Sequence, residues 1–378
     1  MYNLTDGLLK EGTEVTVLAL NTIKHPFNSK LVPQNYIEQT SFQTIFINTN
    51  VNPLKAFLNL FSGTPYNIER FYSTDFEKLI ISVLKEKEFD IIQFESIYVL
   101  PYLNTVKKYS NAKIALRAHN IEHKLWKRRT AEERNIFKKI YFKQLTARLK
   151  EYEIDSIKKV DAIVAITQDD EAWFKAAEPG ISTITIPFGI DINRYNDTDD
   201  LGLTPTVFFI GALDWKPNID GLLWFIENVW KKTNDQTREI KMYIAGKNTP
   251  KKIKELASNN LIVEGEVPDA LRFMGRHKIM VAPLFSGGGM RVKIIEGMAL
   301  GKTIITTSIG AEGIPCTNEE NILIGNSAED LSKHLIKCIN DQNFCNVIGN
   351  NAGIFAHKNY DNRRFSKELI GFYDILIA

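Results

Sequence analysis

The chain has 378 residues, of which 44% are hydrophobic and 24% charged, and its formal net charge is +2 at pH 7. This length allows two domains with cores of their own, and the composition is that of an ordinary globular protein. The small net charge does not support nucleic-acid binding, and no apolar run is long enough to span a bilayer. Three late cysteines without CxxC spacing and six histidines without an HExxH-like grouping predict reduced thiols and no metal site. With no secretory signal visible, we expect a cytoplasmic protein.

The first half of the chain alternates apolar β-rich runs with helical patterns. Its expected strands are residues 14–20, 89–94, 113–118, 161–166 and 183–187. Helical patterns lie between them, notably at 75–87 and over the long region 121–159. This βαβ rhythm predicts a parallel sheet that is covered on both faces.

The first ten residues are an unusual start for such a domain. They predict a helix with Leu4, Leu8 and Leu9 on one face and Gly12 as its stop. A doubly wound domain normally opens with a strand. We therefore expect the N-terminal domain to lack its first strand and the loop that follows it, and the alternative is an unusual first domain.

A second βαβ rhythm follows a polar stretch, residues 193–205, that is rich in Asp, Thr and Pro. Its expected strands are 207–210, 240–245, 261–264, 279–283, 303–306 and 321–324, and its expected helices are 219–231 and 328–340. The sequence thus predicts an N-terminal domain over 1–190, a linker over 191–205, a second domain over 206–358, and a C-terminal helix, 359–378, that packs back on the first domain. We expect an α/β protein of two doubly wound, Rossmann-like domains facing each other across a cleft, with ligands at the carboxyl ends of the strands.

The most informative segment lies between the apolar run 279–284 and the helical pattern that ends at Gly301. Three glycines occupy the turn, namely Gly287, Gly288 and Gly289. Without Cβ atoms they let backbone N–H groups converge on an anion, and the N-terminus of a helix adds partial positive charge. Basic residues at 291 and 293 add full charges, and the carboxylate at 296 could accept hydrogen bonds from sugar hydroxyls. This combination predicts a diphosphate site, and the alternative is a glycine-rich turn that binds nothing.

Together with three further segments, this loop resembles the family 4 glycosyltransferases of the GT-B fold, in the subset with a Gly-Gly-Gly-x-Arg donor loop. The resemblance covers nearly the whole chain, and the segments that carry it are residues 117–122, 186–191, 209–218 and 283–301. It implies transfer of a sugar from a nucleotide diphosphate to an acceptor hydroxyl, with retention at the anomeric carbon and no bound metal or cofactor. It also implies a role in the synthesis of cell-surface polysaccharide or glycoconjugates, with a second domain that binds the donor and a first that binds the acceptor.

The resemblance assigns roles to the charged residues of the glycine-rich segment. Glu296 would bind the ribose of the donor, and Arg291 and Lys293 would face its phosphates. In metal-independent transfer, such protein groups must neutralise the leaving diphosphate as its charge builds.

The segment 209–218 resembles the first strand and loop of the family's donor domain. Gly211 and Lys216 would bind the donor there, although Lys216 is offset by one residue from the family's basic position. Ala212 replaces an arginine that many members have, and Gly288 stands where the first glutamate of a family pair would fall. These departures leave the identity of the donor sugar open.

His119 follows a predicted strand of the first domain and is the catalytic residue that the resemblance implies. It would contact the donor sugar or stabilise charge near the reacting centre. The alternative is a histidine that caps the next helix or bonds to backbone. We expect His123 to be structural, and we leave Glu95 and Glu122 outside the predicted site because solvated loop carboxylates are as common as ligands.

Between positions 124 and 159, basic residues outnumber acidic ones and aromatic residues are interleaved with them. One interpretation is an interfacial helix on anionic lipid, which suits a lipid-linked acceptor and peripheral contact with the inner face of a membrane. The other is a solvated helix whose aromatic residues face the core. The expected partners are a nucleotide sugar and a sugar or lipid-linked acceptor. Nucleic acid is not expected, because no recognised motif accompanies the charge.

Two other functions stay open at this point. A GT-B sugar-nucleotide epimerase would need additional acid–base carboxylates, of which the sequence shows no clear set. A non-catalytic, or truncated and inactive, nucleotide-sugar binder is motivated by Ala212, Gly288 and the expected loss of the front loop. A Rossmann oxidoreductase is not favoured, because no GxGxxG motif follows an early strand.

Overall fold

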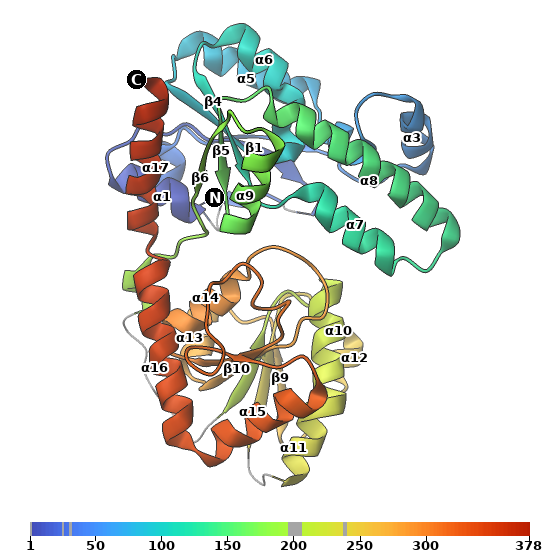
Figure 1. The fold of residues 1–378 in the computed structure, drawn as a ribbon, viewed down its shortest axis with the longest axis vertical. Coiled ribbons are helices and arrows are strands. Elements are labelled where there is room, and N and C mark those ends of the chain that lie inside the picture. The colour runs from blue at the N-terminus through green and yellow to red at the C-terminus, as the bar shows by residue number, and fades with distance from the viewer. Residues whose placement is uncertain (1, 25, 30–31, 196–205, 237–239) are drawn as a thin grey trace. The chain divides into compact units, whose positions relative to one another are not determined.

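The computed structural model describes the chain except for residues 1, 25, 30–31, 196–205 and 237–239. The chain divides into two compact units, Met1–Pro187 with Asn362–Ala378, and Phe188–Asp361 (Figure 1). The predicted linker, residues 191–205, lies largely outside the described residues. Its described part includes a 3-10 helix, η4 Ile192–Tyr195, which belongs to the second unit.

Parallel strands form the centre of the first unit, as predicted. Four of them pair in sequence order, and they are β3 Ile91–Glu95, β4 Lys113–Ala118, β5 Ala162–Ala165 and β6 Ser182–Thr185. A separate parallel pair consists of β1 Leu18–Thr22 and β2 Gln43–Ile47. β5 is buried along its whole length and β4 along all but its first residue, as expected of parallel strands with both faces covered. The strand predicted at 14–20 begins four residues later, and β2 was not predicted.

Helices and short 3-10 segments surround these strands. They are α1 Tyr2–Lys10, α2 Gln34–Gln39, α3 Pro53–Leu58, η2 Asn59–Phe61, α4 Tyr66–Glu69, α5 Thr74–Glu86, η3 Ile97–Tyr102, α6 Leu103–Tyr109, α7 Glu122–Glu132, α8 Ile136–Ile157, α9 Gln168–Ala177 and α17 Asn362–Ile377. The region predicted as one helical stretch over 121–159 is two helices. Asn135 lies at the break and caps α8, since its side-chain oxygen accepts a hydrogen bond from the Lys138 amide at 3.0 Å.

The two ends of the first unit are joined by α1 and α17. The Asn362 amide donates to the carbonyl of Asn3, and Arg363 forms an ion pair of 2.8 Å with Glu11 just after α1. The helix predicted over the first ten residues is therefore present, and Gly12, with φ +86°, follows its end as expected.

The second unit contains a six-stranded parallel sheet in the order β12-β11-β10-β7-β8-β9. The strands are β7 Val207–Ile210, β8 Met242–Ala245, β9 Leu261–Gly265, β10 Ile279–Ala282, β11 Thr303–Thr306 and β12 Leu323–Ile324. The helical segments are α10 Lys216–Phe225, the π-helical turn η5 Ile226–Trp230, α11 Lys231–Gln236, α12 Lys251–Lys254, α13 Ala270–Gly275, α14 Val292–Ala299, α15 Ala328–Asn340 and α16 Gln342–Asn359. β7, β10 and β11 are fully buried, which explains their continuous apolar sequences.

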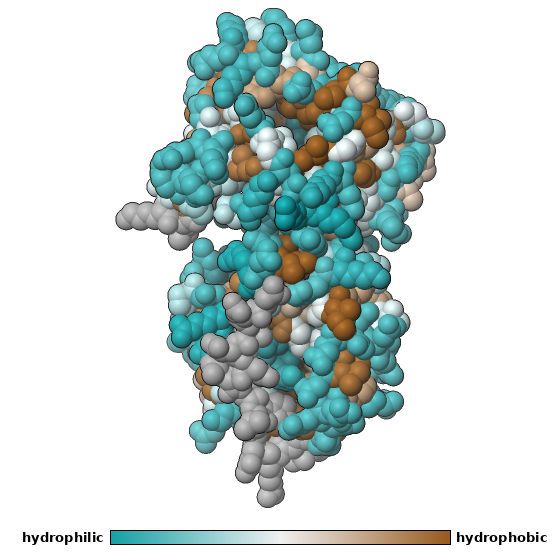
Figure 2. Space-filling model, turned by 90° about the vertical axis from the view of Figure 1, so that its left-hand side faces the viewer, coloured by the Kyte–Doolittle hydropathy of each residue, from teal (hydrophilic) through white to brown (hydrophobic). Residues whose placement is uncertain are grey.

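Polar side chains cover most of the face of the molecule that Figure 2 shows, with apolar side chains in smaller groups among them. Such a surface is normal for a water-exposed α/β protein.

Candidate functional site

The strand order of the second unit predicts where a ligand binds. From β7 the chain continues to β8 and β9 on one side, and it then returns to β10 on the other side of β7. The connections that follow β7 and β10 therefore diverge at the carboxyl edge of the sheet, which is the usual binding position of open α/β sheets. The loop after β7 begins at Gly211, and the loop after β10 holds the three glycines.

Close packing fixes these two loops. Gly221 on α10 allows the helix to approach the chain just after β10, since a Cβ atom there would lie 1.8 Å from the Pro283 carbonyl oxygen. In the glycine-rich loop, Gly287 and Gly289 have φ values of +97° and +82°, which side chains rarely adopt. The amides of Gly288 and Gly289 donate no hydrogen bond within the described residues. Two N–H groups of the loop are thus without a partner among the described residues, and their contact with a ligand stays a prediction.

Replacing Gly287 with alanine tests whether the loop needs this shape. Its Cβ would lie 3.0 Å from the Trp215 ring in a strained backbone conformation, so we expect a loss of about 1–2 kcal/mol in stability and a clear loss of nucleotide affinity. Gly12→Ala is the matched control, because Gly12 has φ +86° with open space around it. It should lose similar stability and keep nucleotide affinity, as measured by urea unfolding and titration calorimetry. Equal affinities for both variants would contradict the role of the loop.

Arg291 stabilises the glycine-rich loop. Its side chain is buried, its guanidinium lies 5.3 Å from the centre of the Trp215 ring, and its Nη1 donates to the Gly288 carbonyl. These contacts close the loop on itself. The predicted contact between Arg291 and the donor phosphates stays a prediction.

Lys293, in the first turn of α14, contacts the end of β7 and the start of α10, on either side of the loop that joins them. Its Nζ donates to the Ile210 carbonyl at 3.1 Å and to Asn218 Oδ1 at 3.0 Å, and it lies 4.5 Å from the centre of the Phe209 ring. Burial and the nearby charge of Arg291 lower the pKa of Lys293 to about 7. An ammonium group has three N–H donors, so one remains for a ligand oxygen.

Nucleotide binding should therefore be accompanied by proton uptake. At about pH 8, Lys293 is largely neutral, and a bound diphosphate would raise its pKa and draw in close to one proton. Calorimetric titration with UDP in buffers of different ionisation enthalpy measures this uptake as the slope of the binding enthalpy. The slope should vanish in Lys293→Met. A wild-type slope of zero would show that Lys293 does not meet the phosphates.

Glu296 lies on the next turn of α14. Tyr195 in η4 donates to its Oε1 at 3.2 Å, and burial raises the pKa of the carboxyl group. Its second oxygen accepts no hydrogen bond from a described residue. Tyr195 was not predicted, because 101 positions separate it from Glu296.

Gly211 and Lys216 differ in their surroundings. A Cβ atom at Gly211 would lie 3.1 Å from Lys293 Nζ, so this glycine adjoins the buried ammonium. Lys216 begins α10 with a side chain that is 86% exposed, and it forms an ion pair of 2.8 Å with Asp220. The structure brings Gly211 close to Lys293 and leaves Lys216 at the surface.

His119 lies in the first unit, just after β4, and pairs with Glu95 at the end of β3. Its Nε2 is 2.8 Å from Glu95 Oε2. Arg117 Nη1 lies 3.6 Å from the other carboxylate oxygen, which also accepts a hydrogen bond of 2.6 Å from Gln93. Burial opposes ionisation of Glu95, but the His119 hydrogen bond and the Arg117 charge outweigh it and lower the pKa to about 2. Glu95 is thus a charged partner that the predicted site did not include.

Backbone strain accompanies this pair. Ser96, which follows Glu95, has φ +107°, a value that is costly for a residue with a side chain. Its amide donates to the Arg117 carbonyl at 3.1 Å, so the strained turn ties the ends of β3 and β4 together. Strain of this kind concentrates at functional sites.

His123 has a structural environment, as expected. Glu153 of α8 accepts hydrogen bonds from the backbone amides of Glu122 and His123 and lies 2.5 Å from His123 Nδ1. These bonds satisfy the free N–H groups at the start of α7. Burial and the charge of Glu153 raise the pKa of Glu122 to about 7, although Tyr98 donates to it at 2.7 Å.

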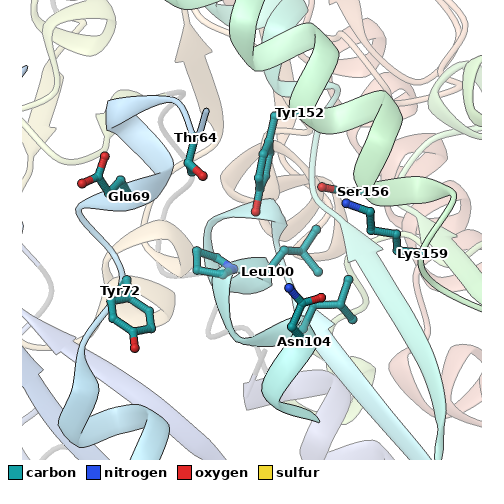
Figure 3. A pocket seen from close by; sticks show the side chains of 10 residues that line it. Thr64, Glu69, Tyr72, Leu100, Asn104, Tyr152, Ser156 and Lys159 are labelled. Atoms are coloured by element: carbon teal, nitrogen blue, oxygen red, sulfur yellow. The ribbon is translucent and has the colours of Figure 1, made fainter. Parts of the chain in front are cut away.

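A separate cavity of about 350 Å³ lies elsewhere in the first unit (Figure 3). Its lining residues are Thr64, Glu69, Tyr72, Leu100, Pro101, Leu103, Asn104, Tyr152, Ser156 and Lys159. None of the predicted site residues lines it. Among the described residues, no group of three or more His, Cys, Asp or Glu side chains could hold a metal ion.

Known proteins resemble this chain in sequence and in fold. Residues 204–341 match the family model described as glycosyl transferases group 1. An uncharacterized 44.6 kDa protein in the cps region of Klebsiella pneumoniae is 26% identical over 288 residues, which are 74% of this chain and 72% of that protein.

Solved structures share the fold across both units. Sucrose-phosphate synthase from Thermosynechococcus elongatus has a TM-score of 0.71 at 15% identity and covers 99% of this chain and 91% of its own. Anabaena HepE, solved in complex with UDP-glucose, has a TM-score of 0.63 at 14% identity. The match covers 99% of this chain and 94% of HepE. The fold is therefore GT-B, with two Rossmann-like domains, and the matched family supports glycosyltransferase function.

No helix in the described ranges has the length and apolar character needed to cross a membrane.

Proposed function

We propose that this chain is a metal-independent, retaining glycosyltransferase of family 4, and that it transfers a sugar from a nucleotide diphosphate to an acceptor hydroxyl. The observation that carries the proposal is the position of Lys293. Its ammonium group is held by Ile210 and Asn218 at the carboxyl edge of the sheet, beside the amides of Gly288 and Gly289, which donate no hydrogen bond to a described residue. Such groups suit a leaving diphosphate, on which negative charge grows as the glycosidic bond breaks.

The donor site of this proposal consists of Gly211, Lys216, Gly287, Gly288, Gly289, Arg291, Lys293 and Glu296. The glycine amides and Lys293 bind the diphosphate, and Arg291 shapes the loop around it. Glu296 accepts hydrogen bonds from ribose hydroxyls through the oxygen that Tyr195 leaves available. UDP-glucose bound to a protein of the same fold supports a nucleotide sugar as the donor.

His119 is the proposed catalytic residue, and Glu95 is the proposed positioning residue. The carboxylate of Glu95 fixes the imidazole by the 2.8 Å contact to its Nε2. With its Nε2–H donated to Glu95, the neutral imidazole presents Nδ1 as an acceptor to a hydroxyl of the donor sugar, and the doubly protonated ring donates from Nδ1 as charge develops at the reacting centre.

The proposed process is the synthesis of cell-surface polysaccharide or glycoconjugates, which the relative in a cps region supports. We place it in the cytoplasm, with a sugar or lipid-linked acceptor and peripheral membrane contact through the basic region 124–159.

A thermal-shift panel of UDP-, GDP- and other nucleotide sugars tests donor binding. Wild type should be stabilised by one class of nucleotide, and Glu296→Ala should reduce that shift because the ribose loses its acceptor. The absence of a shift with every nucleotide in wild type would overturn the proposed donor site. A shift without release of nucleoside diphosphate from the matching donor would favour a non-catalytic binder.

A further inference from the structure

Large apolar side chains are unusually exposed on a short segment of the first unit, α3 with η2. Those exposed are Leu54, Phe57, Leu58 and Phe61. Phe61 is 82% exposed, and its ring meets that of Phe57 edge-on with 6.1 Å between centres. Contiguous exposed apolar groups of this size mark interaction surfaces.

A second exposed apolar group lies at the start of α8. α7 and α8 form a helical hairpin (Figure 1), and its interior is filled by the edge-on pair Trp126–Phe142 and by buried Leu145. Ile136, Phe137 and Ile140 are exposed, with Phe137 at 81%. Residues one turn apart share a helix face. The expectation that the aromatic residues face the core is therefore right for Trp126 and Phe142 and wrong for Phe137.

Arg148 joins the segment of the first group to α8, the helix that carries the second group. From α8 its guanidinium donates to Asn59 Oδ1 at 3.1 Å and to the carbonyls of Ser62 and Thr64 at 2.5 and 3.1 Å. Eleven residues separate Arg148 from Phe137, so the second group begins about 17 Å along the helix from this junction. We call the two groups together the apolar–basic surface.

The charge of this surface is predominantly positive, although Glu69, Glu132 and Glu133 flank its two segments. No Asp or Glu occurs at positions 39–68 or 134–150. Basic residues in or beside the apolar segments are Lys55, Arg134, Lys138, Lys139, Lys143, Arg148 and Lys150. Exposed apolar residues among cations match the interface of an anionic bilayer, in which the rings enter the headgroup layer and the cations meet lipid phosphates.

We infer that the apolar–basic surface binds anionic membranes, with Phe61 and Phe137 as its inserting side chains. This inference deepens the proposed membrane contact by adding α3 and η2, which lie outside the basic region 124–159. A symmetric pair of copies would set cations against cations, which makes a second copy a poorer partner.

Vesicle flotation of the full chain tests the inference without any nucleotide. Wild type should float with phosphatidylcholine vesicles that contain phosphatidylglycerol, and much less with phosphatidylcholine alone. The double variant Phe61→Ser/Phe137→Ser should bind at least about tenfold more weakly, because two rings no longer enter the interface. Lys138→Glu/Lys143→Glu should abolish the preference for phosphatidylglycerol.

Matched controls separate insertion from general surface effects. Ile375→Ser removes an apolar side chain that is 80% exposed on α17, and Lys252→Glu reverses an exposed charge on α12; both should float like wild type. Absence of wild-type flotation would overturn the inference, as would equal loss in the controls. Concentration-dependent dimers that the Phe variants abolish, without flotation, would assign the surface to a second copy. Nucleotide thermal shifts of the Phe variants should equal that of wild type, so failure here is distinct from failure of the donor site.

Discussion

Replacing Lys293 with methionine is expected to lower kcat for release of nucleoside diphosphate from the donor by about 10²–10³-fold. Methionine keeps the length of the side chain and its packing on the Phe209 ring, but it removes the cation. The Nζ atom is fixed in advance by Ile210 and Asn218 and is protonated once the diphosphate is bound, so it stabilises the leaving group without moving at the moment of reaction. Steady-state kinetics with the nucleotide sugar that gives the largest thermal shift measures the loss.

The control for this variant is Lys252→Met, which removes an exposed cation on α12 and should leave kcat unchanged. A thermal melt of each variant shows that it is folded, which matters because Lys293→Met also leaves the Ile210 carbonyl without its donor. A folded Lys293→Met with wild-type kcat would contradict the assignment of Lys293 to the leaving group.

Replacing His119 with alanine is expected to lower kcat by about 10²-fold, with a smaller change in donor KM. The imidazole acts on charge that develops in the transition state, so its loss affects kcat more than ground-state binding. Glu95→Gln should lower kcat by a smaller factor, about tenfold, because glutamine preserves a hydrogen-bond acceptor for His119 but removes the charge. Since the pKa of Glu95 is about 2, its ionisation should contribute no pH dependence to kcat near neutrality.

His123→Gln separates a catalytic effect from a structural one. It disturbs the contact with Glu153 at the start of α7, so the free energy of unfolding should fall by about 1–3 kcal/mol while kcat of the folded enzyme stays unchanged. Urea unfolding and steady-state kinetics measure the two quantities. Equal kcat losses in His119→Ala and His123→Gln would show that His119 has no special role.

The shape of the glycine-rich segment could be predicted because its signal is local. Three glycines between an apolar strand and a helix require a tight, open turn, and two of the three have positive φ. The spacing from the glycines to Lys293 and Glu296 puts both on the first turns of α14. Strand 303–306 and helix 328–340 were also predicted with the limits that the structure has, since each is bounded by polar or glycine residues.

The remaining features depend on contacts between distant positions. Trp215 stacks near Arg291, and Tyr195 bonds to Glu296, but nothing in the local pattern around any of these residues pairs them. β2 was missed because its single parallel partner leaves it partly exposed and without a long apolar run. The pairing of Glu95 with His119 required knowing that β3 and β4 are neighbours, which places their ends side by side.

A crystal structure of the full chain with UDP tests the central claim most directly. The account predicts diphosphate oxygens within hydrogen-bond distance of Lys293 Nζ and of the Gly288 and Gly289 amides, with the ribose hydroxyls on Glu296. UDP bound away from the carboxyl ends of β7 and β10, or bound there with Lys293 still turned from the phosphates, would contradict it.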